Sequence, residues 1–574
     1  MIKLLKNLSV YKWIIFSVFG LVFVQSMADL FLPTLMANII DKGVVVGDTS
    51  YIWKIGGFML LVAALGAAAS VAASYYSSKA AMGLGRDIRR KVFHHVEQFT
   101  LQEFDEVGTA SLITRTTNDI TQVQQVVIMM LRMVISAPIM LVGGVIMAVS
   151  KDAKLSLIIV AIIPVLIGLI LLIQSKAMPL FRTVQKRLDQ LNLVLRENLT
   201  GIRVIRAFNR ESEEKVRLKQ ANKELTDVSI KVNKVMASIM PIMMLIMNLT
   251  VVGVIWFGGI RIDHGNMQIG DLMAYIQYVM QIMFALLMAS MMFIMVPRAA
   301  VSAKRINEVL DMKPAFPDEG TGKADRERGT LEFDRVTFKY PGAEESALSD
   351  ISFTAKPGEV TAIIGGTGSG KSTLVQLIPR FYEVTSGVIR VNGVAIREAS
   401  QEEVRSKIGF VPQKAVLFTG TIAENIRFGK QDAAQEEIEH AARIAQAEDF
   451  IIKMKEGYQE RIEQGGANLS GGQKQRLSIA RALVRKPDLY IFDDSFSALD
   501  FKTDAKLRAA LKEETKHATV LLVAQRVSTV IDADRIIVLE NGRMAGIGTH
   551  EELLNTNAVY REIVESQLSE EEIA

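Results

Sequence analysis

The stretch "VTAIIGGTGSGKSTLVQLIPRFY", residues 360–382, decides the fold of the second half of this 574-residue chain. An apolar run leads into a loop that fits the spacing G-x-x-x-x-G-K-[ST] from Gly365 to Ser372, and a helix-like segment follows. In such a loop the backbone N–H groups surround phosphate oxygens, the lysine reaches the β- and γ-phosphates, and the serine hydroxyl binds Mg²⁺. A chance glycine-rich turn would need neither the strand nor the helix, so we predict a site for a nucleotide and Mg²⁺ in an α/β domain. Its residues are Gly365, Gly366, Thr367, Gly368, Ser369, Gly370, Lys371, Ser372 and Thr373.

Two adjacent carboxylates follow a second apolar strand. In "YIFDDSFSALD", residues 490–500, the run from Tyr490 to Phe492 leads into Asp493 and Asp494. A carboxylate at the end of a buried strand can hold the same Mg²⁺ as Ser372. We therefore predict that Asp493 is a metal ligand.

A second anion site is predicted in "NLSGGQKQRLSIARAL", residues 468–483. Ser470 is suited to cap a helix, Gly471 and Gly472 allow close approach to the backbone, and the N-terminus of a helix attracts negative charge. The loop at 365–373 already accounts for the phosphates of one nucleotide, so this site requires another. The simplest source of a second nucleotide is a second subunit.

The first half contains six apolar stretches that are long enough to cross a bilayer, which takes about 20 residues per helix. They extend over residues 13–40, 55–76, 126–149, 155–173, 236–257 and 272–296. The first is too long for the apolar region of a signal peptide and lacks an A-x-A cleavage site. Basic residues place the N-terminus and the long connections after the second and fourth stretches in the cytoplasm. Helical periodicity predicts that the helices continue beyond the membrane, with turning points near 101–115 and 201–208.

Two features of these spans concern a transport pathway. Asp29 falls inside the first span, where a carboxylate is costly enough to indicate a function, although near a helix end it could simply meet water. Methionines cluster in "MASIMPIMMLIMN", residues 236–248, and "MQIMFALLMASMMFIM", residues 280–295. Such faces suit promiscuous apolar binding and also ordinary helix packing, and both interpretations stay open here.

The composition excludes several kinds of site. The chain has no cysteine, which excludes disulfides, thiol catalysis and thiolate-bound metals. A net charge of +4 gives no indication of nucleic-acid binding. Hydrophobic residues make up 49% of the chain, which fits a membrane part joined to a soluble part. The segment 311–328, rich in Pro, Gly and charge, predicts the boundary between them.

In the order of these motifs the whole chain resembles the ATP-binding cassette (ABC) exporters of the half-transporter type. The resemblance implies an all-α transmembrane domain of six helices at 1–310, a linker at 311–328 and an α/β P-loop nucleotide-binding domain at 329–574. It implies that Tyr340 stacks on adenine, and that Gln413, in "FVPQ", senses Mg²⁺ and the membrane domain and joins Ser372 and Asp493 as a metal ligand. It also implies a D-loop at 497–500 and an intact signature. The signature residues at the nucleotide are Ser470, Gly471, Gly472 and Gln473.

Two positions depart from the family pattern. Where the family has a glutamate and a histidine, this chain has Asp494 and, in "LLVAQRVST", Gln525. An aspartate withdraws the carboxylate by roughly one ångström, and a shift of that size can cost about a hundredfold in rate. Gln525 can bond a γ-phosphate but cannot carry the charge or proton of an imidazole. Together they predict a weakened site whose catalytic residues are Asp494, Gln525 and Gln413.

These observations predict one subunit of an ATP-driven exporter that is integral to the plasma membrane, is surrounded by membrane lipid, and holds its nucleotide-binding domain in the cytoplasm. ATP and Mg²⁺ are the expected cofactors. The expected partner is a non-identical half-transporter that supplies Glu and His, and this chain's signature would complete its site. The expected cargo is a small amphipathic drug or lipid, with peptides left open, and nucleic acid is not an expected partner. A slow homodimeric exporter and a nucleotide-gated regulatory subunit remain alternatives.

Overall fold

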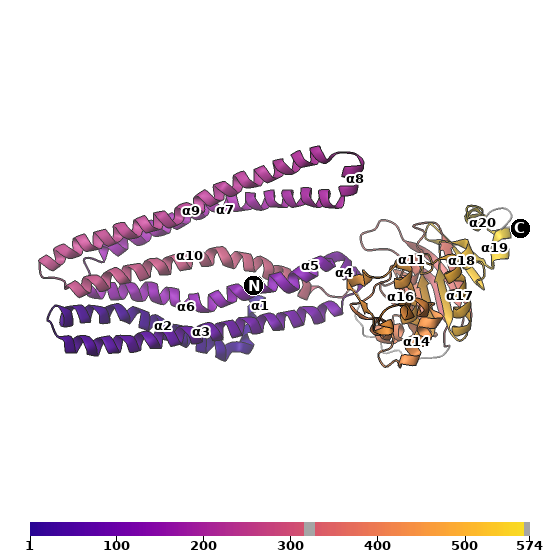
Figure 1. Ribbon diagram of the computed structural model, residues 1–574, viewed down its shortest axis with the longest axis horizontal. Helices are drawn as coiled ribbons and strands as arrows, with labels where there is room; N and C mark the ends of the chain where they lie inside the picture. The colour runs from indigo at the N-terminus through magenta and orange to yellow at the C-terminus, as the bar shows by residue number, and fades with distance from the viewer. Residues whose placement is uncertain (315–327, 568–574) are drawn as a thin grey trace. The chain divides into compact units, whose positions relative to one another are not determined.

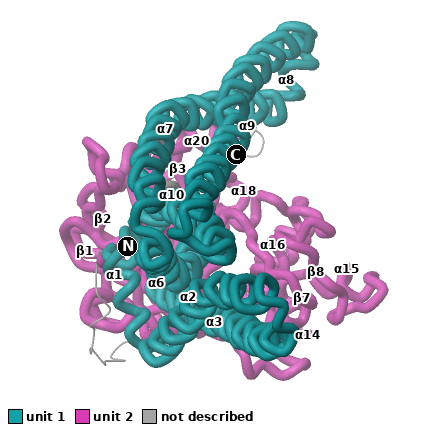
Figure 2. The backbone as a smooth tube through the Cα atoms, turned by 90° about the vertical axis from the view of Figure 1, so that its left-hand side faces the viewer, with its two compact units in different colours: residues 1–97, 110–312 teal, residues 98–109, 313–574 magenta. Residues whose placement is uncertain are grey.

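The computed structural model (Figure 1) describes residues 1–314 and 328–567, apart from the side chains of residues 174, 291, 293 and 294. The chain divides into two compact units, residues 1–97 with 110–312 and residues 98–109 with 313–574 (Figure 2). Most of the predicted linker, residues 315–327, lies outside the described residues.

Six long helices make up most of the first unit, and each is long and apolar enough to cross a membrane. Their bounds are α2 Lys12–Asn38, α3 Thr49–Glu97, α6 Ile120–Lys151, α7 Leu157–Thr200, α9 Glu211–Asp263 and α10 Ile269–Asp311. The six predicted spans are confirmed, because each overlaps one of these helices. The helices also continue past the apolar stretches as predicted, since α3 reaches Glu97 and α7 reaches Thr200.

Shorter elements of the first unit lie before and between these helices. They are α1 Ile2–Leu5, η1 Lys6–Tyr11, η2 Ile39–Val44, α5 Thr109–Thr114, η3 Arg115–Asp119 and α8 Ile202–Ala207. Helix α8 lies at the predicted turning point near 201–208.

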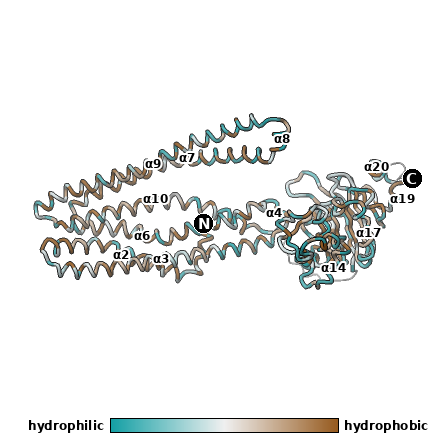
Figure 3. Tube along the Cα trace, in the orientation of Figure 1, coloured by the Kyte–Doolittle hydropathy of each residue, from teal (hydrophilic) through white to brown (hydrophobic). Residues whose placement is uncertain are grey.

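The long helices pack in pairs, with α2 beside α3, α6 beside α10, and α7 beside α9 (Figure 1). Helices α2 and α10 are also joined by hydrogen bonds from Tyr278, whose hydroxyl donates to the carbonyl of Leu30 at 3.1 Å and lies 2.6 Å from the hydroxyl of Thr34. Figure 3 shows apolar residues along the helices and polar residues at the end that α8 closes. Large apolar side chains face outward along the spans, as lipid-facing helices require.

Two sheets form the centre of the second unit. A six-stranded sheet has the order β12-β11-β3-β10-β9-β6, with β12 antiparallel to β11 and the other neighbours parallel. A four-stranded antiparallel sheet has the order β2-β1-β4-β5, and β7 pairs with β8 separately. The strands are β1 Leu331–Phe338, β2 Leu348–Ala355, β3 Val360–Gly365, β4 Ser386–Val391, β5 Val394–Ala395, β6 Ile408–Val411, β7 Gly420–Thr421, β8 Arg461–Ile462, β9 Leu489–Asp493, β10 Thr519–Val523, β11 Arg535–Glu540 and β12 Arg543–Gly548.

Helices surround these sheets. They are α4 Leu101–Val107, α11 Lys371–Leu377, α12 Gln401–Ser406, α13 Ile422–Arg427, α14 Gln435–Ile444, α15 Glu448–Ile452, α16 Gly471–Leu483, α17 Phe501–Glu514, α18 Val527–Val530, α19 His550–Thr556 and α20 Ala558–Glu565, with 3₁₀ turns η4 Gly457–Gln459 and η5 Gln464–Gly466. Helix α4 belongs to this unit although it precedes the linker, and the hydroxyl of Tyr382 donates to the carboxylate of Asp105 at 2.9 Å. The predicted domain boundaries stay a prediction, and local sequence pattern does not reveal a contact as distant as that of Tyr382 with Asp105.

The parallel sheet brings the two nucleotide motifs together. Strands β3 and β9 both pair with β10, so their carboxyl ends meet at one edge of the sheet. The glycine-rich loop follows β3 at this edge, and Asp493 ends β9. Strands β11 and β12 form a hairpin whose two-residue turn, Asn541 and Gly542, has the positive φ angles of 47° and 76° that a type I′ turn requires.

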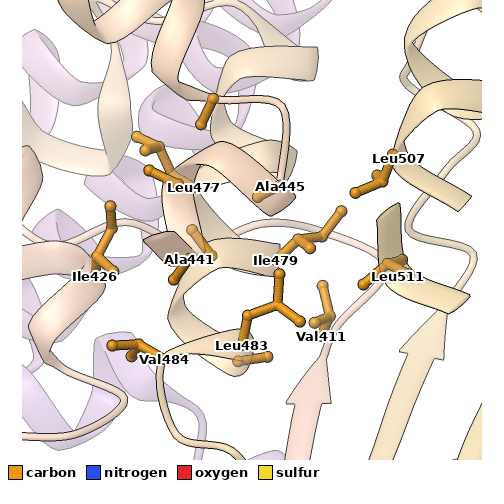
Figure 4. Close-up of a cluster of buried hydrophobic side chains, with 14 of the residues drawn as sticks. Val411, Ile426, Ala441, Ala445, Leu477, Ile479, Leu483, Val484, Leu507 and Leu511 are labelled. Atoms are coloured by element: carbon orange, nitrogen blue, oxygen red, sulfur yellow. The ribbon is translucent and has the colours of Figure 1, made fainter. Parts of the chain in front are cut away.

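Helix α16 is held by an apolar cluster on its inner side (Figure 4). Leu477, Ile479 and Leu483 of α16 pack there with Val411 of β6 and Leu511 of α17. Because these side chains are almost completely buried, the start of α16, where the signature lies, has a fixed position within this unit.

Candidate nucleotide-binding site

The glycine-rich loop joins β3 to α11 in a conformation that needs glycine. Gly368 and Gly370 have φ of 82° and 97°, which L-residues rarely adopt. A Cβ on Gly370 would also lie 2.9 Å from the carbonyl oxygen of Ala347. Beside Gly366 and Gly368, in contrast, a Cβ would meet no atom within 4 Å, which leaves room for a ligand against the backbone.

The groups around this loop fit a bound phosphate. Lys371 is buried, with 8% of its surface exposed, and its Nζ donates to the carbonyl oxygens of Gly365 and Gly366 at 2.8 Å each. Burial lowers the pKa of Lys371, whereas the charges of Asp494 and Asp493 raise it. Among the described residues, the buried hydroxyl of Ser369 has no hydrogen-bond partner. The two carbonyl groups are neutral and balance the positive charge of Lys371 only in part. With the unpaired hydroxyl of Ser369 beside it, this charge suits the binding of an anion.

Two oxygens lie where Mg²⁺ is predicted to bind. The Ser372 hydroxyl donates to Oδ1 of Asp493 at 2.9 Å, and Asp493 is only 2% exposed. Burial raises the pKa of Asp493, the bond from Ser372 lowers it, and the charge of Asp494 raises it further. In residues 1–314 and 328–567 no group of three or more His, Cys, Asp or Glu side chains could hold a metal. Mg²⁺ takes one or two protein oxygens and completes its shell with phosphate and water, so Ser372 and Asp493 would be enough to hold it.

The two departures from the family pattern touch each other. Oδ2 of Asp494 accepts hydrogen bonds from Nε2 of Gln525 at 2.8 Å and from Nε2 of Gln413 at 3.3 Å. Burial raises the pKa of Asp494, while Gln413, Lys371 and Gln525 lower it. The structure thus brings the three predicted catalytic residues together, and their roles stay predictions, as does metal binding by Gln413.

Gln567 was missed by the sequence analysis. Its Nε2 donates to the carbonyl oxygen of Gln525 at 2.9 Å, and its Oε1 accepts from the backbone N–H of Val527 at 2.8 Å. The side chain of Gln567, which follows α20, therefore holds the backbone at Gln525 and at Val527. An isolated glutamine near the chain end gives no sequence signal for such a contact.

Tyr340 lies beside the glycine-rich loop. Its hydroxyl is 3.0 Å from the hydroxyl of Thr373, and its ring contacts Phe338 and Tyr382 edge-on, with centroids 4.8 and 5.4 Å away. These contacts fix the orientation of a half-buried ring next to the phosphate-binding residues. Stacking of this ring on adenine stays a prediction.

The signature begins α16 with the predicted cap. Oγ of Ser470 accepts from the backbone N–H of Gln473 at 3.3 Å, and Oε1 of Gln473 accepts from the N–H of Ser470 at 2.8 Å. A Cβ on Gly471 would meet no atom within 4 Å, so the start of this helix is open. That 470–473 and the loop at 365–373 form two separate anion sites stays a prediction.

Two family descriptions match the chain in the order predicted. Residues 14–309 match the ABC transporter transmembrane region, and residues 348–497 match the ABC transporter domain. The chain belongs to the ABC transporter family. This ABC transporter is 43% identical to an uncharacterized ABC transporter ATP-binding protein of Mycobacterium tuberculosis over 97% of this chain and 96% of that protein.

Two further comparisons show that it is an exporter. It is 30% identical to an ATP-dependent lipid A-core flippase of Chromobacterium violaceum over 95% of this chain and 94% of the flippase. It also matches the structure of a bacterial Atm1-family ABC exporter with ATP bound, with a TM-score of 0.80 and 25% identity over 98% of this chain and 99% of that chain. The predicted family, fold class and location are confirmed: this is an ATP-hydrolysing, multi-pass membrane exporter of the half-transporter type, with its nucleotide-binding domain in the cytoplasm.

Proposed function

We propose that this half-transporter forms a heterodimeric pump in which its own ATP site is weakened and its signature completes the productive site of the partner. The observation that supports this most directly is the hydrogen bond of 2.8 Å between Gln525 and Asp494. The two side chains expected to activate water and to contact the γ-phosphate are each weaker than their family counterparts, and they belong to one site.

In this proposal the chain's residues bind ATP more effectively than they promote its cleavage. The loop N–H groups and Lys371 hold phosphate, and Ser372 and Asp493 hold Mg²⁺, which neutralises phosphate charge when bound. Asp494 reaches less far toward an attacking water than glutamate would. Gln525 donates one neutral hydrogen bond and supplies no positive charge.

The proposed cargo is a small amphipathic compound, a drug or a lipid. The methionine-rich faces of α9 and α10 support an apolar binding surface that can adapt its shape. The resemblance to a lipid A-core flippase agrees with a lipid-like cargo. The proposed partner is a second half-transporter with glutamate and histidine at the positions of Asp494 and Gln525.

The proposal is tested on the purified chain alone, reconstituted in lipid. We expect it to bind ATP and to hydrolyse it very slowly. Asp494→Glu combined with Gln525→His should raise Mg²⁺-dependent turnover at least about tenfold, because a longer carboxylate and an imidazole restore positioning and charge at the reacting phosphate. In a homodimer of this double variant, the signature of each copy would complete the ATP site of the other copy. Adding Gly471→Glu to the double variant should therefore remove the gain in turnover.

The alternative is a slow homodimeric exporter. Brisk turnover by the unmodified chain alone, or a double variant that gains nothing over it, would favour this alternative and remove the argument for a non-identical partner.

A further inference from the structure

A polar cavity lies inside the helical unit, between α2, α6 and α10. Its volume is about 290 Å³, and Gln25, Ser26 and Asp29 of α2, Ser136 of α6 and Gln281 of α10 line it, together with methionines of α6 and α10. All three helices contribute from inside their apolar stretches, 13–40, 126–149 and 272–296. A carboxylate at this depth is expensive unless it has a partner.

Other carboxylates of this unit near the ends of the spans do have partners. Asp152 pairs with Arg261 at 2.7 Å, and Asp271 pairs with Lys151 at 2.7 Å. Asp29 is half-buried, and the only partner of its carboxylate among the described residues is the neutral side chain of Gln25 on the same helix, which hydrogen-bonds to it without forming an ion pair. Its negative charge is therefore available to a ligand.

A second acceptor is left without a partner at the same place. Gln281 donates from Nε2 to the backbone carbonyl of Asp29 at 2.9 Å, which fixes the side chain of Gln281 against α2. Among the described residues its Oε1 is buried and has no hydrogen-bond donor. Burying an acceptor without a donor is unfavourable, so a ligand that donates hydrogen bonds would relieve it.

An apolar cavity adjoins the polar one. It lies between α9 and α10, has a volume of about 390 Å³, and is lined by Met240, Met243, Met244, Met247 and Met283, with Pro241 and Leu287. Phe284 lines both cavities. One molecule with a polar head and an apolar body could therefore occupy the two together.

We propose that the Asp29 cavity binds the protonated amine of an amphipathic substrate whose apolar body occupies the methionine-lined cavity. An alkylammonium group supplies the positive charge that pairs with Asp29. Its N–H groups also supply a hydrogen-bond donor for Oε1 of Gln281. This inference rests on the proposed export of amphipathic compounds and assigns the substrate class of the same pump.

The test uses two probes that differ only at the head. One is a dansyl-labelled alkyl chain that ends in a primary ammonium, and the other is its neutral N-acetyl derivative. Binding to the purified full chain in lipid, without nucleotide, is followed by dansyl fluorescence. Asp29→Asn should weaken binding of the ammonium probe at least about tenfold, as expected for a lost hydrogen bond to a charged group, and leave the acetylated probe unchanged.

Two matched variants control for charge and for position. Asp29→Glu, which keeps the charge, should retain most of the preference for the ammonium probe. Asp189→Asn removes an exposed carboxylate from α7 and should affect neither probe. Equal weakening of both probes by Asp29→Asn would show that Asp29 has a structural role and would overturn the proposal.

A second measurement uses the unmodified chain, so it does not depend on how the variants fold. A hydrophobic carbodiimide should label Asp29, and the ammonium probe should slow this labelling, read by mass spectrometry, while the acetylated probe should not. Equal rates with both probes would contradict the proposal. Because neither measurement needs ATP, a failure of ATP-driven transport would contradict the export function and leave the binding result standing.

Discussion

At position 494 the backbone conformation favours a short side chain such as aspartate, whereas activation of water would favour the longer glutamate. Asp494 has φ of 47°, a left-handed conformation that short polar residues such as Asp and Asn tolerate better than other L-residues. Its carboxylate is held there by Gln525 and Gln413. Aspartate therefore suits the backbone at this point, but its carboxylate extends one methylene less far than a glutamate would.

A side chain far along the chain stabilises the neighbouring loop. Gln567→Ala should speed hydrogen exchange at the Val527 amide about fivefold, because the N–H of Val527 loses its acceptor. Gln567→Glu loses the donor to the carbonyl of Gln525 but keeps an acceptor for the N–H of Val527. The Val527 amide should therefore stay protected in this variant. Exchange-mass spectrometry over residues 525–530 measures the effect, and identical rates in all three proteins would show that Gln567 does not hold the loop.

What could be predicted at the residue scale follows from local spacing. The loop at 365–373, the adjacent carboxylates and the Ser470 cap were all found from the sequence, because each is a short motif with a defined neighbouring strand or helix. The contacts of Gln567 with Gln525 and of Tyr382 with Asp105 could not be found in this way. They join positions that are far apart in the chain, and no periodicity records them.

Among the helices, the turn between α6 and α7 is fixed by an ion pair between a buried carboxylate and a partly buried arginine. Arg261 of α9 donates to Oδ2 of Asp152 at 2.7 Å, and the Leu155 N–H donates to Oδ1 at 2.8 Å. The Asp152 side chain is 2% exposed. Sequence periodicity predicts the helices on both sides of this turn but not the partner that holds them together.

Breaking this pair should destabilise the helical unit. Asp152→Ala leaves the Arg261 charge unpaired and should cost on the order of 3 kcal/mol, seen as a lower Tm of the purified protein. The exposed pair of Arg210 and Glu213 is the matched control, and Glu213→Ala should not change Tm measurably. Equal Tm values for both variants would contradict a stabilising role for the Asp152 pair.

The same pair predicts how stability depends on pH. Burial raises the pKa of Asp152, but the bonds from the Leu155 N–H and from Arg261, with the charge of Arg261, lower it on balance. This contribution is fully present above the unfolded-state pKa of about 3.9 and is lost as pH falls through the lower folded-state value. The difference in Tm between the unmodified chain and Asp152→Ala should therefore be constant from pH 5 to 7 and shrink below about pH 4. A Tm difference at pH 3 that is as large as the difference at pH 7 would rule out this explanation.

At the scale of the whole molecule, the proposed function gives this chain two half-sites of unequal quality. The proposed half-site at β3 and β9 combines groups that would hold phosphate and metal with a short acid and an uncharged glutamine. The half-site at the start of α16 has its cap and open glycine in place. ABC exporters act as dimers of half-transporters, so these two half-sites would face two different ATP molecules, and damage to each should have different consequences.

The most direct test compares two substitutions in this chain within the pump assembled with its partner, by measuring ATPase activity. Asp494→Asn should lower turnover by no more than about threefold, because the site it affects contributes little. Gly471→Glu should lower it on the order of a hundredfold or more, since an anionic side chain would repel the phosphate of the productive site. That glutamate meets no atom of its own chain within 4 Å of its Cβ and suits a helix N-terminus, so the fold should be unchanged. If Asp494→Asn silences the pump as completely as Gly471→Glu, the two sites are equivalent and the weakened-site account is wrong.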